Sequence, residues 1–210
     1  NAGEVLTMFL GVIGAGIIGL DQAGGAVAVP LLATQILWIN LLTDSAPALA
    51  MGVDPPPDDV MSRPPRKLTE RIIDSEMQVG VLFVGVIMAL ATLLALDIGL
   101  PGGLIDGSGE LTEARTMAFT TLVLAQLFNC FNARSDRVSA FHHLFTNPLL
   151  WGAIALSLVL QVAVVYIPLL NRAFGTAPLS GGDWLLCAAL ASTVLWGDEL
   201  RKVVGRARRG

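Results

Sequence analysis

The stretch ILWINLLTDSAPALAMGVDPPPDDVMSRPPRK, residues 36–67, has an unusual first half. That half is apolar enough for a membrane helix, yet it carries Asn40, Thr43, Asp44 and Pro47. Polar groups at membrane depth are costly, and they face the interior of a helix bundle or water. The stretch therefore predicts a membrane helix whose polar residues serve a function.

The composition agrees with a membrane location. Of the 210 residues, 54% are hydrophobic and only 14% are charged, whereas soluble domains carry about a quarter charged residues. The two cysteines, Cys130 and Cys187, lie far apart in apolar runs and match neither a disulfide framework nor a zinc site. We interpret them as small buried residues.

Apolar runs divide residues 1–210 into six candidate spans. The spans are about 1–20, 29–51, 76–99, 114–133, 148–169 and 183–203, and the longest connection is the loop 52–75. We expect an all-α membrane protein, a polytopic bundle of six transmembrane helices with the second one broken at Thr43–Pro47. The first run is short for a bilayer. We therefore expect that helix to begin upstream and the chain to be the C-terminal part of a longer protein.

The basic residues predict the orientation. Eleven of the 13 lysines and arginines fall in the loop 52–75, the loop 134–147 and the C-terminal tail. Because basic residues gather on the cytoplasmic side, we expect the loop 52–75 to be cytoplasmic and both chain ends to lie toward the cytoplasm. The short opposite loops and the Ala/Gly/Arg-rich composition favour a bacterial plasma membrane. The expected surroundings are a lipid bilayer, and we expect no nucleic-acid partner.

Three polar clusters lie within the spans at helical spacings of three or four. They are Asn1 with Glu4, Asn40 with Thr43 and Asp44, and Gln126 with Asn129. One interpretation is that such residues join helices by hydrogen bonds. For Glu4 and Asp44 we favour a cation site, because two carboxylates at mid-depth repel each other unless a cation lies between them.

Pro47 adds backbone oxygens to this site. It has no N–H, and its ring clashes with the carbonyl of Thr43. Broken membrane helices are tolerated where the freed groups line a cavity or bind ions. All these donors are hard oxygens, which suit Ca²⁺ and disfavour soft metals. The candidate ligands counted on this basis are Asn1, Glu4, Thr43, Asp44 and Gln126.

Four motifs together resemble type II P-type ATPases, especially calcium pumps of the sarcoplasmic-reticulum kind. They are WINLLTDSAPALAMGVDPPPDDVMSRPPR, NAGE, TMAFTTLVLAQLFNCFNARS and LWGDELRKVV. The resemblance covers essentially the whole chain and implies that its six spans are spans five to ten of a ten-span pump. It implies a first calcium site at Asn1, Glu4, Thr43, Asp44 and Gln126. A second would use Asn40, Asp44, backbone oxygens and a glutamate of the fourth span, which is absent from this chain.

Gln126 departs from the resemblance. Two-site calcium pumps have a glutamate there, whereas plasma-membrane calcium pumps have glutamine but lack the acid that matches Glu4. We therefore expect one calcium ion per ATP rather than two. Asn40 argues against a sodium/potassium pump, which carries aspartate at that position.

The expected function is the ion-binding and translocating part of a calcium pump. The chain has no phosphate-binding loop, phosphorylation motif or catalytic residue of its own. The resemblance implies that ATP and Mg²⁺ are used by phosphorylation, nucleotide and actuator domains which, with spans one to four, precede this chain. The proline-rich loop 52–75 would support the phosphorylation domain. The alternatives are the same architecture carrying Mn²⁺, Na⁺ or H⁺, and a standalone membrane remnant without ATPase activity.

Overall fold

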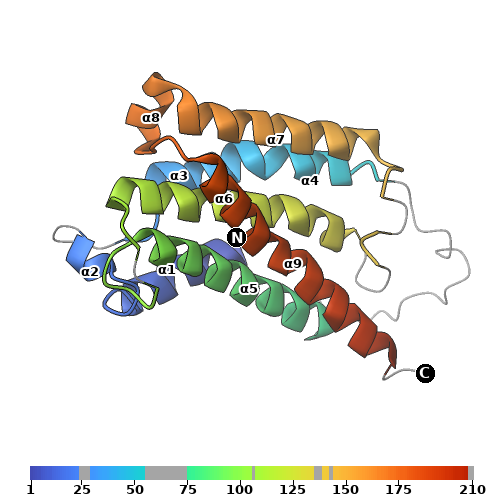
Figure 1. The fold of residues 1–210 in the computed structure, drawn as a ribbon. Helices are drawn as coiled ribbons and strands as arrows, with labels where there is room; N and C mark the ends of the chain where they lie inside the picture. Colours follow the sequence, from blue (N-terminus) through green and yellow to red (C-terminus); the bar gives the residue numbers. More distant parts are fainter. Residues whose placement is uncertain (24–28, 55–74, 106, 135–138, 142–143, 208–210) are drawn as a thin grey trace, which may run out of the picture.

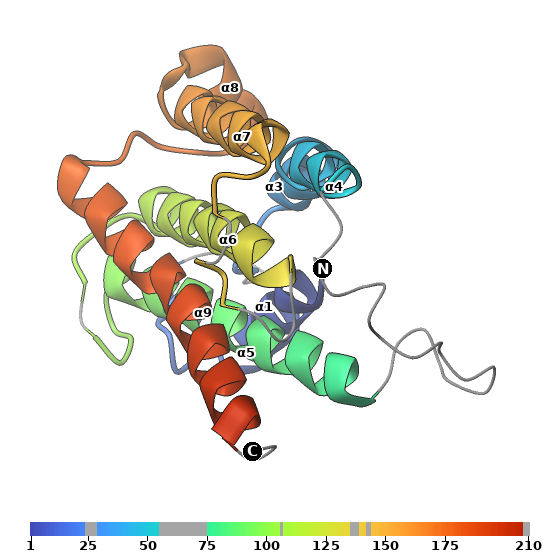
Figure 2. The ribbon, with the colours of Figure 1, turned by 90° about the vertical axis from the view of Figure 1, so that its right-hand side faces the viewer.

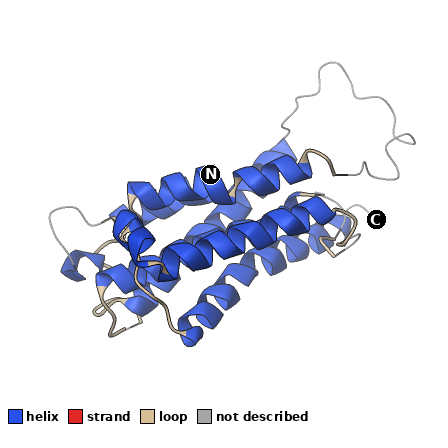
Figure 3. Ribbon diagram, turned by 90° about the horizontal axis from the view of Figure 1, so that it is seen from above, coloured by secondary structure: helices blue, strands red, loops and turns tan. Residues whose placement is uncertain are grey.

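The computed structural model describes residues 1–23, 29–54, 75–105, 107–134, 139–141 and 144–207. Within these residues it contains helices, turns and loops and no strand, so the all-α prediction is confirmed for the described part of the chain (Figure 3). The proline-rich segment predicted to support a phosphorylation domain falls almost entirely on residues 55–74, outside the described residues.

The helices follow the predicted segments closely. In chain order they are α1 (Ala2–Ile13), α2 (Leu20–Ala23), α3 (Ala33–Trp38), the π-helical segment η1 (Ile39–Thr43), α4 (Ser45–Met51), α5 (Ser75–Gly99), α6 (Leu111–Ala133), α7 (Pro148–Tyr166), α8 (Pro168–Phe174) and α9 (Gly181–Ala207). Three predicted spans, 76–99, 114–133 and 183–203, each correspond to one long helix, and 148–169 corresponds to α7 and the start of α8. The span 29–51 corresponds to the series α3, η1 and α4, and the span 1–20 corresponds mainly to the shorter helix α1. The second predicted helix is therefore interrupted, with the π-helical turn placed just before Asp44.

Helix α6 lies at the centre of the bundle. It packs against α5 and α9 on one side and against α4, η1 and α7 on the other (Figures 1 and 2). Its buried side chains include Phe119 and Leu122, which are fully enclosed. Buried threonines also face its neighbours, and Thr120 Oγ1 accepts a hydrogen bond of 3.1 Å from Gln161 Nε2 of α7. The central helix is thus held by both apolar packing and polar contacts.

Two of the described helices are long and apolar enough to cross a membrane, Met77–Gly99 and Pro148–Tyr166. The others differ for visible reasons. The helix α1 is apolar but has only 12 residues, and the series α3, η1 and α4 is not one continuous helix. The helix α6 carries internal threonine and amide side chains, and α9 ends in a charged segment. Length and composition therefore identify two of the six predicted spans.

The first helix ends earlier than the span 1–20 predicts. The helix α1 stops at Ile13, where the N–H of Gly14 donates to the carbonyl of Leu10 at 2.7 Å. The following residues turn, and Gly19 has a φ of +70° beside the backbone of Pro101. Glycine adopts this left-handed conformation without the clash that a Cβ would cause. The glycine-rich sequence after Leu10 explains the early end.

Candidate cation site

Glu4 joins three helices by its carboxylate. The residue is 5% exposed and lies in the first turn of α1. Its Oε2 accepts a hydrogen bond of 2.6 Å from Asn40 Nδ2 of η1, and its Oε1 accepts one of 2.9 Å from Gln126 Nε2 of α6. Both donors are neutral amides, which satisfy the oxygens but do not balance a carboxylate charge. A buried carboxylate in such surroundings favours a nearby cation.

The π-helical turn rearranges the backbone next to this carboxylate. The N–H of Asp44 donates to the carbonyl of Ile39 at 3.0 Å, five residues back, instead of the carbonyl of Asn40. The carbonyl of Asn40 accepts instead from the Ser45 hydroxyl at 3.1 Å. Single π-turns within helices are rare and occur frequently at functional sites. The turn therefore changes the partners of backbone oxygens beside Asp44.

Pro47 acts one turn later. It lacks the N–H that would reach the carbonyl of Thr43. That carbonyl accepts only a long hydrogen bond, 3.4 Å, from the Ser157 hydroxyl of α7 among the contacts of the described residues. The break predicted at Thr43–Pro47 is thus present, but it begins earlier, at the π-turn over Ile39–Thr43.

A cavity of about 420 Å³ lies beside these groups. Asn1, Asp44 and Gln126 all line it, together with Asn129 and Cys130 of α6. Asp44 is half-buried, and its carboxylate lies within electrostatic range of Glu4. The Gln126 Oε1 atom is buried and has no hydrogen-bond partner within the described residues. The cavity is therefore lined by the carboxylate residue Asp44 and by Gln126, whose buried oxygen can still accept a hydrogen bond.

The predicted ligands differ in how they relate to this cavity. Asn1, Asp44 and Gln126 line it directly, whereas Glu4 and Asn40 are linked to it by the hydrogen bonds of Glu4. The side chain of Thr43 is buried, and its hydroxyl donates to the carbonyl of Ile39 at 2.9 Å. Thr43 does not line the cavity. Its hydroxyl oxygen could coordinate a cation there only after a local rearrangement.

Sequence reasoning missed several neighbours of the site. Ser157 of α7 reaches the freed carbonyl of Thr43, and Cys130 lines the cavity although it was interpreted only as a small buried residue. The spacing of Cys130, four residues after Gln126, places both on one face of α6. That spacing was the available signal. In the part of the chain that the structure describes, no group of three or more His, Cys, Asp or Glu side chains forms a metal cluster.

The chain matches one protein-family model. The model is described as "Cation transporting ATPase, C-terminus", and the match covers residues 28–204. This range includes η1, α4 and α6, and it leaves out the segment that carries Glu4.

Curated proteins match this chain as well, and one of them covers all of it. A calcium-transporting ATPase of Bacillus subtilis (strain 168) is 35% identical over 192 residues, covering 91% of this chain and 20% of that protein. Calcium-transporting ATPase 1 of Saccharomyces cerevisiae (strain ATCC 204508 / S288c) is 36% identical over 180 residues, covering 85% and 18% respectively. An endoplasmic reticulum-type calcium-transporting ATPase 4 of Arabidopsis thaliana is 26% identical and covers all of this chain and 24% of that protein. The chain thus spans about a fifth of the length of these relatives.

Proposed function

This chain belongs to the family of cation-transporting ATPase C-termini, and from that premise we propose that it is the ion-binding and translocating membrane portion of an ATP-driven calcium pump. The pump moves Ca²⁺ out of the cytoplasm through oxygen ligands between helices. Relatives named as calcium-transporting ATPases support the choice of ion.

The arrangement around Glu4 is the observation that carries this proposal. One buried carboxylate links α1, η1 and α6, and a second carboxylate, that of Asp44, lines the adjoining cavity. Ca²⁺ binds six to eight oxygens in flexible geometry. Amide, hydroxyl, carboxylate and backbone oxygens are present here on three helices. The donor set suits a hard cation.

Binding requires the amides to reverse. Asn40 and Gln126 now direct their NH₂ groups at Glu4. An amide presents its oxygen instead after a half-turn about its terminal bond. In the proposed mechanism Ca²⁺ arrives between Glu4 and Asp44, the amide of Gln126 turns its oxygen to the ion, and the carboxylates lose their mutual repulsion. Thr43 and Asn40, with backbone oxygens of the broken helix, complete the coordination.

We further propose that all six long segments cross the membrane. The helices α1, α6, α9 and the series α3, η1 and α4 cross beside the two apolar helices α5 and α7, and their polar side chains face the bundle. The distribution of Lys and Arg supports a cytoplasmic position for the loop 52–75 and for both chain ends. The composition supports a bacterial plasma membrane.

The remainder of the pump is the proposed partner of this chain. Spans one to four and the actuator, nucleotide and phosphorylation domains would precede residue 1, and ATP with Mg²⁺ would act there. The coverage of about a fifth of each relative supports this arrangement. No residue of this chain is assigned a catalytic role, and the chain alone is expected to hydrolyse no ATP.

Two alternatives fit the same sequence. One is the same architecture carrying Mn²⁺, Na⁺ or H⁺, since the ligands are oxygens in each case. The other is a standalone membrane protein, a remnant of a pump. The coding sequence upstream of Asn1 separates the remnant from the pump, because a pump requires an open frame that encodes a phosphorylation motif.

The test is a cation profile of ATP hydrolysis by the complete protein that contains this chain. The proposal expects activity that depends on micromolar-range Ca²⁺ and is lost in Glu4→Gln. Activity that follows Mn²⁺, Na⁺ or pH instead, with no response to Ca²⁺, would contradict calcium transport and favour the first alternative.

A further inference from the structure

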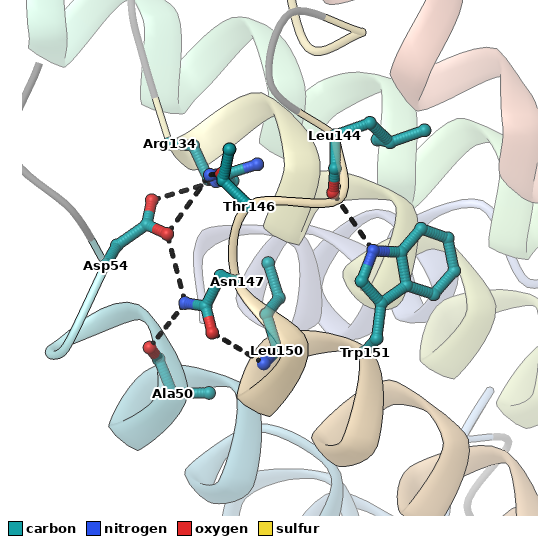
Figure 4. A network of polar contacts seen from close by, with 8 residues as sticks. All are labelled: Ala50, Asp54, Arg134, Leu144, Thr146, Asn147, Leu150 and Trp151. Carbon is teal, nitrogen blue, oxygen red and sulfur yellow. Dashed lines mark hydrogen bonds and ion pairs between the residues drawn. The ribbon is translucent and has the colours of Figure 1, made fainter. Parts of the chain in front are cut away.

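Asp54 forms a polar network directly after α4 (Figure 4). Its Oδ2 accepts a hydrogen bond of 2.8 Å from Arg134 Nε, and its Oδ1 accepts one of 3.1 Å from Arg134 Nη2. This is a two-point ion pair between a carboxylate and a guanidinium. The side chains of Arg134 and Asp54 are only 11% and 19% exposed. Paired contacts of this geometry fix orientation as well as distance.

Asn147 extends the network to a third helix. Its Nδ2 donates to Asp54 Oδ1 at 3.0 Å and to the carbonyl of Ala50 in α4 at 2.9 Å. Its Oδ1 accepts from the N–H of Leu150 at 3.0 Å and so caps the first turn of α7. The residue is 3% exposed, so its bonds are shielded from water. One amide thus satisfies groups at the end of α4 and the start of α7.

Each of the three helices that meet at this network, α4, α6 and α7, is also connected to the candidate cation site. The helix α4 follows directly after Asp44, and α6 carries Gln126 about two turns before Arg134. The helix α7 carries Ser157, which bonds the carbonyl of Thr43. Because a short helix moves nearly as a rigid unit, clamping its end also fixes the side chains one or two turns away. The network therefore lies where it can set the separation of the two cavity-lining side chains.

We infer that Asp54, Arg134 and Asn147 form a positioning clamp for the cation site, with Asp54 as its central residue. The clamp holds α4 and α6 in the register that lets Asp44 and Gln126 face one cavity. This inference rests on the proposed cation site. None of the three residues lines the cavity, and none is a ligand.

A second carboxylate provides a matched control. Asp97 is 1% exposed, and its oxygens accept from the N–H groups of Leu104 and Ile105 at 2.8 and 2.9 Å. It lies near the C-terminal end of α5, which is at the opposite end of the bundle from the C-terminal end of α4 (Figure 1). Loss of Asp97 should lower stability as loss of Asp54 does, without moving α4 relative to α6.

The experiment uses the complete pump and measures the Ca²⁺ concentration that gives half-maximal ATPase activity. In Asp54→Asn we expect this concentration to rise about tenfold, the lower end of the range for residues that support metal ligands. The rate at saturating Ca²⁺ is expected to stay unchanged. In Asp97→Asn the melting temperature is expected to fall and the half-maximal Ca²⁺ concentration to stay unchanged.

A double-mutant cycle tests whether the clamp is one unit. We expect Arg134→Gln to raise the half-maximal Ca²⁺ concentration as Asp54→Asn does, and the double variant to show no larger shift than either. Independent, additive shifts would overturn the clamp, as would an unchanged Ca²⁺ response in Asp54→Asn or an equal shift in Asp97→Asn.

A distance measurement separates this inference from the proposed function. Spin labels at Leu49 of α4 and Ala133 of α6, both exposed positions, report how firmly the two helix ends are held. We expect a broader distance distribution in Asp54→Asn than in the wild type or Asp97→Asn. If the wild type shows no Ca²⁺ dependence, the proposed function fails, while an unchanged distribution in Asp54→Asn overturns the clamp by itself.

Discussion

The helix α7 and the neighbouring stretch from α3 to α4 are similar in length, but their buried polar residues have different roles. The helix α7 packs beside α4 and runs without interruption from Pro148 to Tyr166. Its buried polar residues, Ser157 and Gln161, donate to groups on neighbouring segments. The stretch from α3 through η1 to α4 is broken, and Asp44 within it faces a cavity.

The difference shows that a polar residue in a membrane helix does not by itself indicate a site. In α7 each polar side chain gives a hydrogen bond to an oxygen of a neighbour and leaves its own helix regular. In the broken stretch the π-turn and Pro47 change the backbone partners. The carboxylate of Asp44 forms no ion pair with a basic side chain within the described residues. A functional site is indicated by the combination of carboxylate, irregular backbone and cavity.

Replacing Asp44 should have the largest effect. In the complete pump, Asp44→Asn is expected to abolish Ca²⁺-dependent phosphorylation while the protein stays folded and inserted. One unit charge at contact distance contributes about 4 kcal/mol at an intermediate dielectric, which is about a thousandfold in affinity. The matched change in the regular helix, Gln161→Met, should leave the Ca²⁺ dependence of phosphorylation unchanged. Equal losses of Ca²⁺-dependent phosphorylation in both variants would show that the broken stretch and α7 do not differ in function.

Repairing the broken helix should have the next largest effect. In Pro47→Ala the new N–H can bond the carbonyl of Thr43, which removes that oxygen from the site. We expect the Ca²⁺ affinity to fall about tenfold, as for a supporting group of a metal site, while the melting temperature rises because proline is unfavourable within a helix. The control is Pro168→Ala, at the start of α8. An unchanged affinity in Pro47→Ala would mean that the break has no part in binding.

Gln126→Glu tests how the charge at the site affects stability with and without Ca²⁺. It places a second carboxylate where Gln126 Nε2 now donates to Glu4 at 2.9 Å. Without Ca²⁺ the two carboxylates repel each other, so the melting temperature should fall. With Ca²⁺ it should recover, and a second ion should bind if the rest of that site is intact. Thermal unfolding with and without Ca²⁺ measures this, and a variant that Ca²⁺ does not stabilise would contradict the assignment.

The smallest effect concerns acid stability at the end of the broken helix. Burial raises the pKa of Asp54, but hydrogen bonds from Arg134 and Asn147 and the charge of Arg134 outweigh it, so that pKa lies below its ordinary value of 3.8. The stabilisation of the folded state by ionised Asp54 is therefore complete above the ordinary pKa, and it is lost as the pH falls through the lowered pKa. Melting temperatures from about pH 5 downward should fall less steeply in Asp54→Asn than in the wild type. Parallel curves would exclude this contribution.

The sequence predicted the helices well because long apolar runs determine them. The segments 76–99 and 114–133 agree with α5 and α6 to within a few residues. The break near Pro47 was predicted from the chemistry of proline, but the π-turn before it was not, because it depends on contacts of the folded backbone. The early end of α1 was missed, since hydropathy counts glycine-rich turns such as that at Gly19 as part of an apolar run.

Contacts between distant residues were beyond sequence reasoning. Spacing indicated that Asn1 and Glu4 share a face, and that Asn40, Thr43 and Asp44 share another. Spacing could not show that Glu4 lies beside Gln126, 122 residues away. The two residues were grouped by their oxygen chemistry alone, and the resemblance to calcium pumps implied the same set. The pairing of Asp54 with Arg134, 80 residues apart, had no signal in the sequence, because charges at helix ends are common and their partners depend on packing.

Equilibrium binding of radioactive calcium to the purified complete pump tests both the site and the number of ions that it holds. We propose that the broken helix and Glu4 form a calcium site in which the neutral Gln126 replaces an anionic ligand. We expect one Ca²⁺ bound per phosphorylation site in the wild type and none in Asp44→Asn. Two ions per site in the wild type would contradict the single-ion claim, and wild-type binding in Asp44→Asn would contradict the site itself.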